Sequence, residues 1–213
     1  MGICYIIASM KTTYQIDRKP DDFVIAADGG YAQEFGCRPD AVIGDFDSLG
    51  YVPAGESVQV YPKQKDDTDM MLAVKLGLEK GYREFVLLGG IGGRFDHMMA
   101  NVQTLAYLHA NEADGVLKSA ERDIYFIGAK KADNTSDAVG KLTFPAQTMG
   151  ILSVFSYGEK ARKVTILGAE YELQEATLTD AFPLGVSNSF CGKEVTISVG
   201  EGRLLIVHEK NMV

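Results

Sequence analysis

The chain has 213 residues, of which 46% are hydrophobic and 23% are charged, and its formal net charge is −8. That length and composition are typical of a soluble globular protein with one large domain or two modest ones, and the negative charge argues against non-specific binding of nucleic acid, which requires clustered Lys and Arg. No apolar run approaches the roughly 20 residues that a membrane-spanning helix needs, so we expect no membrane partner.

The first third of the chain predicts a parallel sheet. Its short apolar runs each end in polar or glycine residues, as buried strands of such a sheet do. These runs lie at residues 3–8, 23–27 and 41–43, with a weaker, alternating run at 58–61. After the second run, the pattern predicts a short helix over Tyr31–Phe35.

An acidic loop, Gly44–Gly50 (GDFDSLG), follows the third of these runs. Asp45 and Asp47 flank an aromatic ring, and like charges this close repel each other unless a cation, a proton or strong donors offset them. Proteins hold Mg²⁺ by one or two carboxylates together with substrate phosphates, so the loop suits a metal–phosphate site. The alternative is a solvated acidic turn in which Asp47 and Ser48 cap a short helix.

A second acidic cluster precedes a predicted helix. It consists of Asp66, Asp67, Thr68 and Asp69. The apolar pattern that follows has helical spacing and ends where Gly81 can supply a C-cap. Asp and Thr are preferred N-caps, which explains part of the cluster. A single cap needs one side chain, so the three acids and the threonine exceed that requirement.

A glycine-rich turn, GGIGGRFDH, follows the clearest buried strand, residues 85–88, and leads into a long helical pattern. Such a turn forms an anion cradle, because unpaired backbone N–H groups and the helix dipole point toward the loop. It is neither a Walker loop nor a Rossmann fingerprint. Arg94 suits phosphate and Asp96 suits a metal or a hydroxyl. His97 more readily packs or caps than titrates in catalysis.

The second half of the chain changes character. After a run at 122–127 and a polar, linker-like segment at 129–137, the apolar runs are short and separated by Gly, Pro and Asn turns. We therefore expect an α/β N-terminal domain with a mainly parallel sheet (1–128), plus an all-β, sandwich-like C-terminal domain (138–213). One patch in it, 183–190 (PLGVSNSF), mixes Ser and Asn with apolar residues, which by itself favours turns.

Charged side chains recur where predicted strands end or helices begin. They are Asp28, the pair Asp45 and Asp47, the pair Asp66 and Asp69, and the pair Arg94 and Asp96. In an open α/β sheet, the loops beyond the carboxyl ends of the strands share one edge, where ligands bind. The sequence therefore predicts a Mg²⁺–nucleotide site at that edge, suited to phosphoryl-type transfer, which needs mostly positioning and charge neutralisation.

Five motifs occur in order across nearly the whole chain: ADGG (27–30), RPDAVIGDFDSL (38–49), KDDTD (65–69), GGRFDHMMAN (92–101) and GVSNSF (185–190). This series resembles the thiamine pyrophosphokinase family. The resemblance implies transfer of the β,γ-pyrophosphoryl group of ATP to the hydroxyethyl oxygen of thiamine, giving thiamine diphosphate and AMP. It also implies an N-terminal catalytic domain, a C-terminal β-domain, Mg²⁺ as cofactor, and a homodimer with active sites between the subunits.

The same resemblance implies roles for individual residues. The catalytic acids would be Asp45, Asp47, Asp66 and Asp69, and the metal ligands would be Asp45, Asp47, Asp69 and Asp96. ATP would be bound by Asp28, Gly92, Gly93, Arg94, Asp96 and His97, and thiamine by Ser187 and Asn188 of the partner subunit. Some relatives place a Trp against the thiamine rings; this chain has none, so Phe190 or a Tyr would take that place.

Two rival functions stay open at this level. One is a pyrophosphokinase for another alcohol, such as a hydroxymethylpterin, because the nucleotide half would look similar; the SNSF patch argues for thiamine. The other is a non-catalytic nucleotide-binding sensor, which we would expect to have lost some of the acids, and none of the expected acids is missing.

The three cysteines, Cys4, Cys37 and Cys191, are far apart and form no CxxC pair, which excludes a zinc site or a disulfide framework built on such a pair. A reducing cytoplasm fits this usage. The N-terminal apolar run has no basic lead and is too short for a secretory signal, so we expect a cytoplasmic protein.

Overall fold

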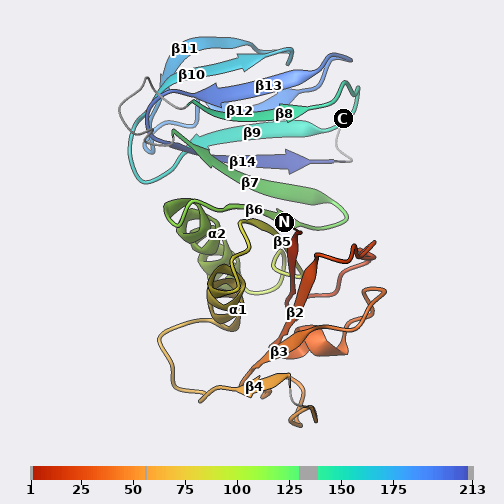
Figure 1. Cartoon of the computed structure of the whole chain (residues 1–213). Helices are drawn as coiled ribbons and strands as arrows, with labels where there is room; N and C mark the ends of the chain where they lie inside the picture. Colours follow the sequence, from red (N-terminus) through yellow and green to blue (C-terminus); the bar gives the residue numbers. More distant parts are fainter. Residues whose placement is uncertain (1, 56, 130–138, 211–213) are drawn as a thin grey trace. The chain divides into compact units, whose positions relative to one another are not determined.

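A computed structural model describes residues 2–55, 57–129 and 139–210 (Figure 1). Contacts divide the chain into two compact units, Met1–Ala120 and Glu121–Val213. Among the described residues, the helices are all too short or too polar to cross a membrane.

Within the described residues, the first unit is built on six parallel strands. They lie in the order β6-β5-β1-β2-β3-β4, and each pairing between neighbours is parallel. The strands are β1 (Cys4–Ile7), β2 (Phe23–Ala27), β3 (Ala41–Gly44), β4 (Val58–Val60), β5 (Glu84–Leu88) and β6 (Asp114–Lys118). Because they are parallel, their carboxyl ends share one edge of the sheet, as the sequence predicts.

The strand interiors explain why the sequence shows continuous apolar runs. Residues of β1, β2 and β3 that are at most 2% exposed include Ile6, Ile7, Val24, Ile25, Val42 and Ile43. Neighbouring side chains on a strand point to opposite faces, so burial of consecutive residues means that both faces of the sheet are covered.

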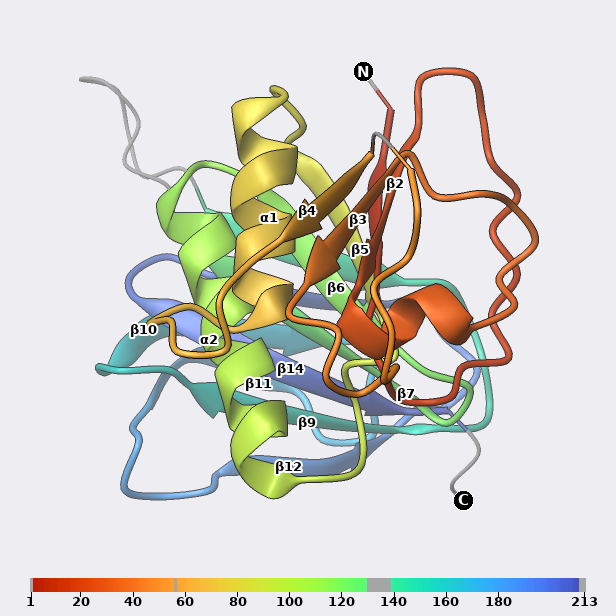
Figure 2. The same cartoon turned by 90° about the horizontal axis from the view of Figure 1, so that it is seen from below.

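The described part of the first unit also holds two α-helices, which pack against each other (Figure 2). They are α1 (Asp69–Glu79), which contacts β1, β2 and β3, and α2 (Phe95–Ala110), which contacts β6. The Thr68 side-chain oxygen caps α1 by accepting a hydrogen bond from the Met71 N–H at 3.2 Å. Beyond α1, Gly81 has a φ of 91°, the left-handed conformation in which glycine stops a helix. Both end signals in the sequence are confirmed.

One local prediction for this unit is wrong, and one strand was not predicted. The expected helix over Tyr31–Phe35 is a 3₁₀ helix at Asp28–Ala32, which starts directly after β2. It can start there because Gly30 packs on the end of β1, where a Cβ would lie 1.9 Å from the Ile7 carbonyl oxygen. Strand β6 was not predicted, because an Asp-Gly pair opens it and resembles a turn.

The described part of the second unit holds eight strands, and their pairings are antiparallel. Four of these strands are hydrogen-bonded to one another in the order β12-β9-β14-β7, and the other four form a sheet in the order β11-β10-β13-β8. Their bounds are β7 (Arg122–Gly128), β8 (Gly140–Phe144), β9 (Ile151–Ser156), β10 (Ala161–Leu167), β11 (Leu173–Leu178), β12 (Gly185–Ser189), β13 (Val195–Val199) and β14 (Arg203–Glu209). Side chains of both sets of strands lie in one hydrophobic core, for example Val154 of β9 and Ile206 of β14 from the first set and Ile197 of β13 from the second. This shared core agrees with the expected sandwich.

The division between the units falls before β7, whereas the sequence pattern placed residues 122–127 in the first domain. The reason is long-range: β7 pairs with β14 along all of Arg122–Gly128, and no local pattern reveals a partner so far along the chain. The predicted linker lies almost wholly outside the described residues. Strand β11 was not predicted, and the SNSF patch, whose composition favours turns, lies mostly in β12.

Candidate active site

A cavity of about 530 Å³ lies at the carboxyl edge of the parallel strands of the first unit. Its walls come from the segments that follow β1, β2, β3, β4 and β5, and from the first turns of α1 and α2. Segments far apart in the sequence therefore contribute side chains to one space, as parallel topology predicts.

Three carboxylates converge in this cavity. Asp28, Asp45 and Asp47 each offer an oxygen, and these atoms lie within 4.8 Å of one another. Asp28 is buried, and its Oδ1 has no hydrogen-bond partner among the described residues. A buried, unpaired carboxylate oxygen is unfavourable unless a cation offsets it. All-oxygen donors and an orphaned oxygen fit a hard divalent cation such as Mg²⁺.

Phe46 explains why both acids of the GDFDS loop reach the cavity. Its ring is buried in a cluster with Ala26 and Val42, and its φ is 60°. With the ring anchored in the core, the carboxylates on either side of it both line the cavity. The backbone N–H of Asp47 also donates to Asp45 Oδ1 at 3.1 Å, which holds the two residues together.

Gly44 brings the end of β3 against Asp28. A Cβ at this position would lie 3.0 Å from the Asp28 Cα, closer than nearly all real contacts of this kind. Asp28 itself has a φ of 47°, in the left-handed region that few non-glycine residues adopt. The close approach of two strand ends thus sets the spacing of the acids.

Two lysines compensate the negative charge. Lys65 Nζ lies 2.9 Å from Asp69 Oδ1 and 3.4 Å from Asp45 Oδ2, and Lys63 Nζ lies 2.8 Å from Asp47 Oδ2. Burial lowers the pKa of Lys65, but its hydrogen bond to Asp69 and the neighbouring charges outweigh burial and raise it. The hydrogen bond from Lys63 lowers the pKa of Asp47.

Asp69 stands in a different environment from Asp47. Burial raises the pKa of Asp69, while the hydrogen bond and charge of Lys65 oppose that rise. Asp69 also opens α1, where the helix dipole favours a negative charge. The cavity therefore holds carboxylates with pKa values shifted in opposite directions.

The glycine-rich turn opens onto the same cavity. Three of its glycines use the left-handed region, with φ values of 66° at Gly89, 102° at Gly92 and 67° at Gly93. Asn101 of α2 donates from Nδ2 to the Gly90 carbonyl at 2.8 Å and ties the helix to the turn. This hydrogen bond holds the turn against α2, the helix that follows it.

Arg94 is exposed at the start of α2. Its Nε donates to Asp96 Oδ1 at 3.1 Å, and this bond raises the pKa of Arg94 and lowers that of Asp96. Asp96 Oδ1 also accepts from the His97 backbone N–H at 3.0 Å. Of the three, Arg94 and His97 line the cavity.

Most of the predicted site residues come together here. Those that line the cavity are Asp28, Asp45, Asp47, Asp69, Gly92, Arg94 and His97. Gly93, Asp66 and Asp96 lie in the same segments but outside this set, and Asp66 is exposed. For a metal, the structure groups Asp28 with Asp45 and Asp47, where the family resemblance named Asp69 and Asp96 as the further ligands.

The predicted thiamine residues belong to β12 of the second unit. Ser187 is exposed, with a φ of 60°. Asn188 is 5% exposed, and its Oδ1 accepts from the backbone N–H groups of Tyr171, at 2.9 Å, and Ser189, at 3.0 Å. Its Nδ2 donates to the Tyr171 carbonyl at 2.7 Å. The Asn188 amide is therefore engaged in fixing the segment that carries Tyr171.

The aromatic residues differ in what they can offer a ligand. Phe190 is 5% exposed and packs edge-on against Phe144 and His208. Tyr171 is 64% exposed, on the segment that Asn188 holds. Tyr171 rather than Phe190 can therefore present a ring face to a small molecule.

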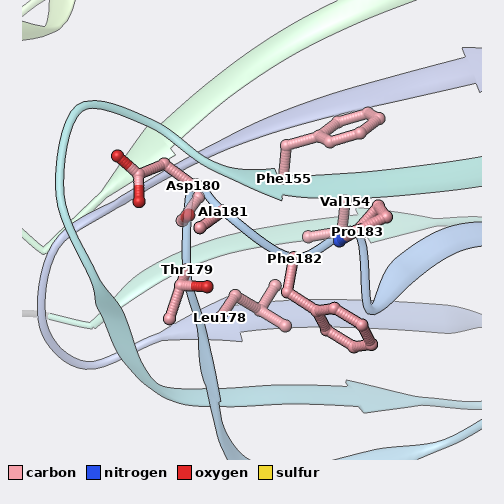
Figure 3. Close-up of a pocket in the computed structure, with 9 residues that line it drawn as sticks. Val154, Phe155, Leu178, Thr179, Asp180, Ala181, Phe182 and Pro183 are labelled. Atoms are coloured by element: carbon pink, nitrogen blue, oxygen red, sulfur yellow. The ribbon is translucent and has the colours of Figure 1, made fainter.

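A smaller hollow, about 260 Å³, lies in the second unit between β9 and the segment 178–183. Figure 3 shows the rings of Phe155 and Phe182 pointing to opposite sides, and Thr179 and Asp180 turned apart. Among the described residues that line it, Asp180 is the one ionisable side chain. Charged groups converge in the cavity of the first unit and not in this hollow.

Sequence reasoning missed several groups that shape the site. Lys63 and Lys65, separated by one residue, directly precede the three acids of the second acidic cluster, and this position was a usable signal. Asn101, to which no role of its own was assigned from the sequence, holds the glycine-rich turn. Tyr171 had no local signal, because its exposure depends on a contact with Asn188, 17 residues later.

Comparison with known proteins gives two matching family models. The one described as "Thiamin pyrophosphokinase, catalytic domain" matches residues 18–117, and the one described as "Thiamin pyrophosphokinase, vitamin B1 binding domain" matches residues 141–204. Together they cover more than half of the chain.

Individual relatives agree with these models. The chain is 26% identical over 178 residues to a thiamine pyrophosphokinase of Bacillus subtilis, covering 81% of this chain and 79% of the relative. It is 22% identical over 182 residues to thiamin pyrophosphokinase 1 of Caenorhabditis elegans, covering 82% and 72%. In fold, it is similar to a crystal structure of thiamine pyrophosphokinase from Bacillus subtilis, with a TM-score of 0.80, 22% identity and 100% of both chains covered. With both models matched in order along the sequence, the chain belongs to the thiamin pyrophosphokinase family.

Proposed function

We propose that the protein transfers the β,γ-pyrophosphoryl group of ATP to the hydroxyethyl oxygen of thiamine, giving thiamine diphosphate and AMP. One observation carries the proposal: Asp28, Asp45 and Asp47 converge in the cavity that also contains the glycine-rich turn and Arg94. Metal-binding acids beside an anion cradle suit a reaction whose catalysis consists mainly of positioning and charge neutralisation.

The nucleotide occupies the glycine-rich side of the cavity in this proposal. The backbone of the turn and the N-terminus of α2 take the phosphates, because both present N–H groups to an anion. Arg94 adds a planar fork that matches phosphate oxygens, and it exchanges its present partner Asp96 for them. His97 lines the same side and gives a further donor.

The acids hold the cation. Asp28, Asp45 and Asp47 supply oxygens to Mg²⁺, with Asp69 beside them on α1. When bound, the ion neutralises charge on the phosphates and polarises the transferred group. The Lys65 ammonium lies between Asp45 and Asp69, and its positive charge offsets the repulsion between the two carboxylates.

Thiamine is assigned to the second unit of a partner subunit. Near β12, Ser187 and the ring of Tyr171 are exposed. The buried Asn188 amide fixes the backbone of Tyr171 by two hydrogen bonds. An exposed aromatic face suits a flat, cationic ligand. The protein would then act as a homodimer, since a two-fold interface presents the same patch to each catalytic cavity.

The experiment is an AMP-release assay with purified protein, ATP and Mg²⁺. We expect AMP release with thiamine, none without an acceptor alcohol, and none with Asp47→Asn, because an amide cannot hold Mg²⁺ against a polyphosphate. Hydroxymethylpterin serves as the second acceptor. Turnover with the pterin and not with thiamine would establish the other pyrophosphokinase, and nucleotide binding without turnover of either would establish a sensor.

A further inference from the structure

The two lysines beside the acids differ in their surroundings. Lys65 has a side chain 13% exposed and lies between Asp45 and Asp69. The side chain of Lys63 is 76% exposed, and its ammonium pairs with Asp47. Lys63, unlike Lys65, is among the residues that line the cavity. Lys65 is mostly buried between two acids, whereas Lys63 is exposed and faces the cavity.

A cation at the acidic cluster competes with Lys63. Asp47 is one of the carboxylates whose oxygens lie within 4.8 Å of each other, and the same side chain accepts Lys63 at 2.8 Å. A divalent ion on this carboxylate reduces the attraction for the ammonium and repels it. Exposed ion pairs are weak and screened by water, so the Lys63–Asp47 pair is one that can exchange.

A displaced Lys63 has a second partner in the same cavity once nucleotide is bound. Lys63 follows β4, and Arg94 follows β5, with β3, β2 and β1 between these strands. The two cations therefore enter from opposite sides of the acids. A lysine ammonium on its flexible stem is a common phosphate ligand, acting as a point charge.

We propose that Lys63 couples metal binding to nucleotide binding: it occupies Asp47 in the free protein and moves to a nucleotide phosphate when a divalent cation takes that carboxylate. The inference rests on the proposed function, because it needs a polyphosphate in this cavity. It implies that Lys63 opposes binding of the metal alone and favours binding of the metal–nucleotide complex.

The test compares Lys63→Met with the unchanged protein by calorimetry, with two probes. The first is Mn²⁺ alone. The second is Mg²⁺ with α,β-methylene-ATP, in which carbon replaces the oxygen that the transfer would cleave, so that binding is measured without reaction. We expect Lys63→Met to bind Mn²⁺ about two- to fivefold more tightly and the nucleotide complex about two- to fivefold more weakly, the scale of one exposed ion pair.

Lys75→Met is the matched control, because Lys75 also forms an ion pair, with Asp67, but does not line the cavity. It should change neither affinity, and Lys63→Arg should restore both. If Lys63→Met shifts both affinities in the same direction, or neither, the coupling is refuted while the proposed function stands. If the unchanged protein binds neither probe, the proposed function fails and the coupling fails with it.

Discussion

Replacing Asn188 with alanine decides whether this side chain supports the fold or contacts thiamine directly. The amide makes three hydrogen bonds, to the N–H and carbonyl of Tyr171 and to the N–H of Ser189. Each such bond contributes about 0.5–1.5 kcal/mol net. Water can reach the exposed Tyr171 segment and offset part of the loss, so we expect unfolding to become easier by about 2–3 kcal/mol.

Urea unfolding, followed by circular dichroism, measures this loss, and the Michaelis constants for ATP and thiamine are determined on the same samples. If Asn188 supports the fold, Asn188→Ala lowers the free energy of unfolding and raises the KM for thiamine, because the Tyr171 segment is no longer fixed. The KM for ATP stays the same. Ser187→Ala, at an exposed neighbour, is the control and should leave the free energy of unfolding within about 0.5 kcal/mol.

The two measurements distinguish a role of Asn188 in supporting the fold from direct contact with thiamine. An Asn188→Ala protein that unfolds at the same urea concentration as the unchanged chain, yet needs far more thiamine, would mean that the amide binds the ligand and that its bonds to Tyr171 contribute little. An unchanged KM for thiamine with reduced stability would remove Tyr171 from the thiamine site.

Two further predictions concern the acids and the assembly. Gly44→Ala places a methyl group 3.0 Å from the Asp28 Cα and should lower kcat on the order of tenfold or more by displacing that carboxylate; an unchanged kcat would show that the strand ends can separate freely. For the homodimer, inactive Asp47→Asn and Tyr171→Ala chains should regain activity when they are mixed under conditions of subunit exchange, because one composite site is then intact. Proven exchange without activity would place the whole site in one chain.

Much of the first unit could be predicted because its signals are local. The runs at 23–27 and 85–88 are buried strands, and the cap at Thr68 and the stop at Gly81 bound a helix as their chemistry requires. The convergence of Asp28, Asp45 and Asp47 followed from one topological rule, that parallel strands end at a common edge.

What could not be predicted depends on contacts between distant residues. Strand β7 joins the second unit because of its pairing with β14, some 80 residues later. The sequence marked Asn188 as a turn former or a thiamine ligand, and it could not show the hydrogen bonds of its amide to Tyr171. Lys63 and Lys65 were visible in the sequence, but their assignment to particular acids requires the fold that places β3 beside β4.

The unusual backbone at Asp28 and Phe46 has a consequence for how the site responds to its ligands. Both residues hold positive φ angles, and such conformations cost of order 1–3 kcal/mol each unless the surrounding structure enforces them. Here the enforcement comes from the buried Phe46 ring and from the contact of Gly44 with Asp28. The unfavourable gathering of like charges is thus completed during folding. In the proposed function, a cation would therefore find its carboxylates already assembled, and its binding would need little reorganisation. At these same residues, substitutions that relax the backbone should stabilise the fold at the expense of turnover.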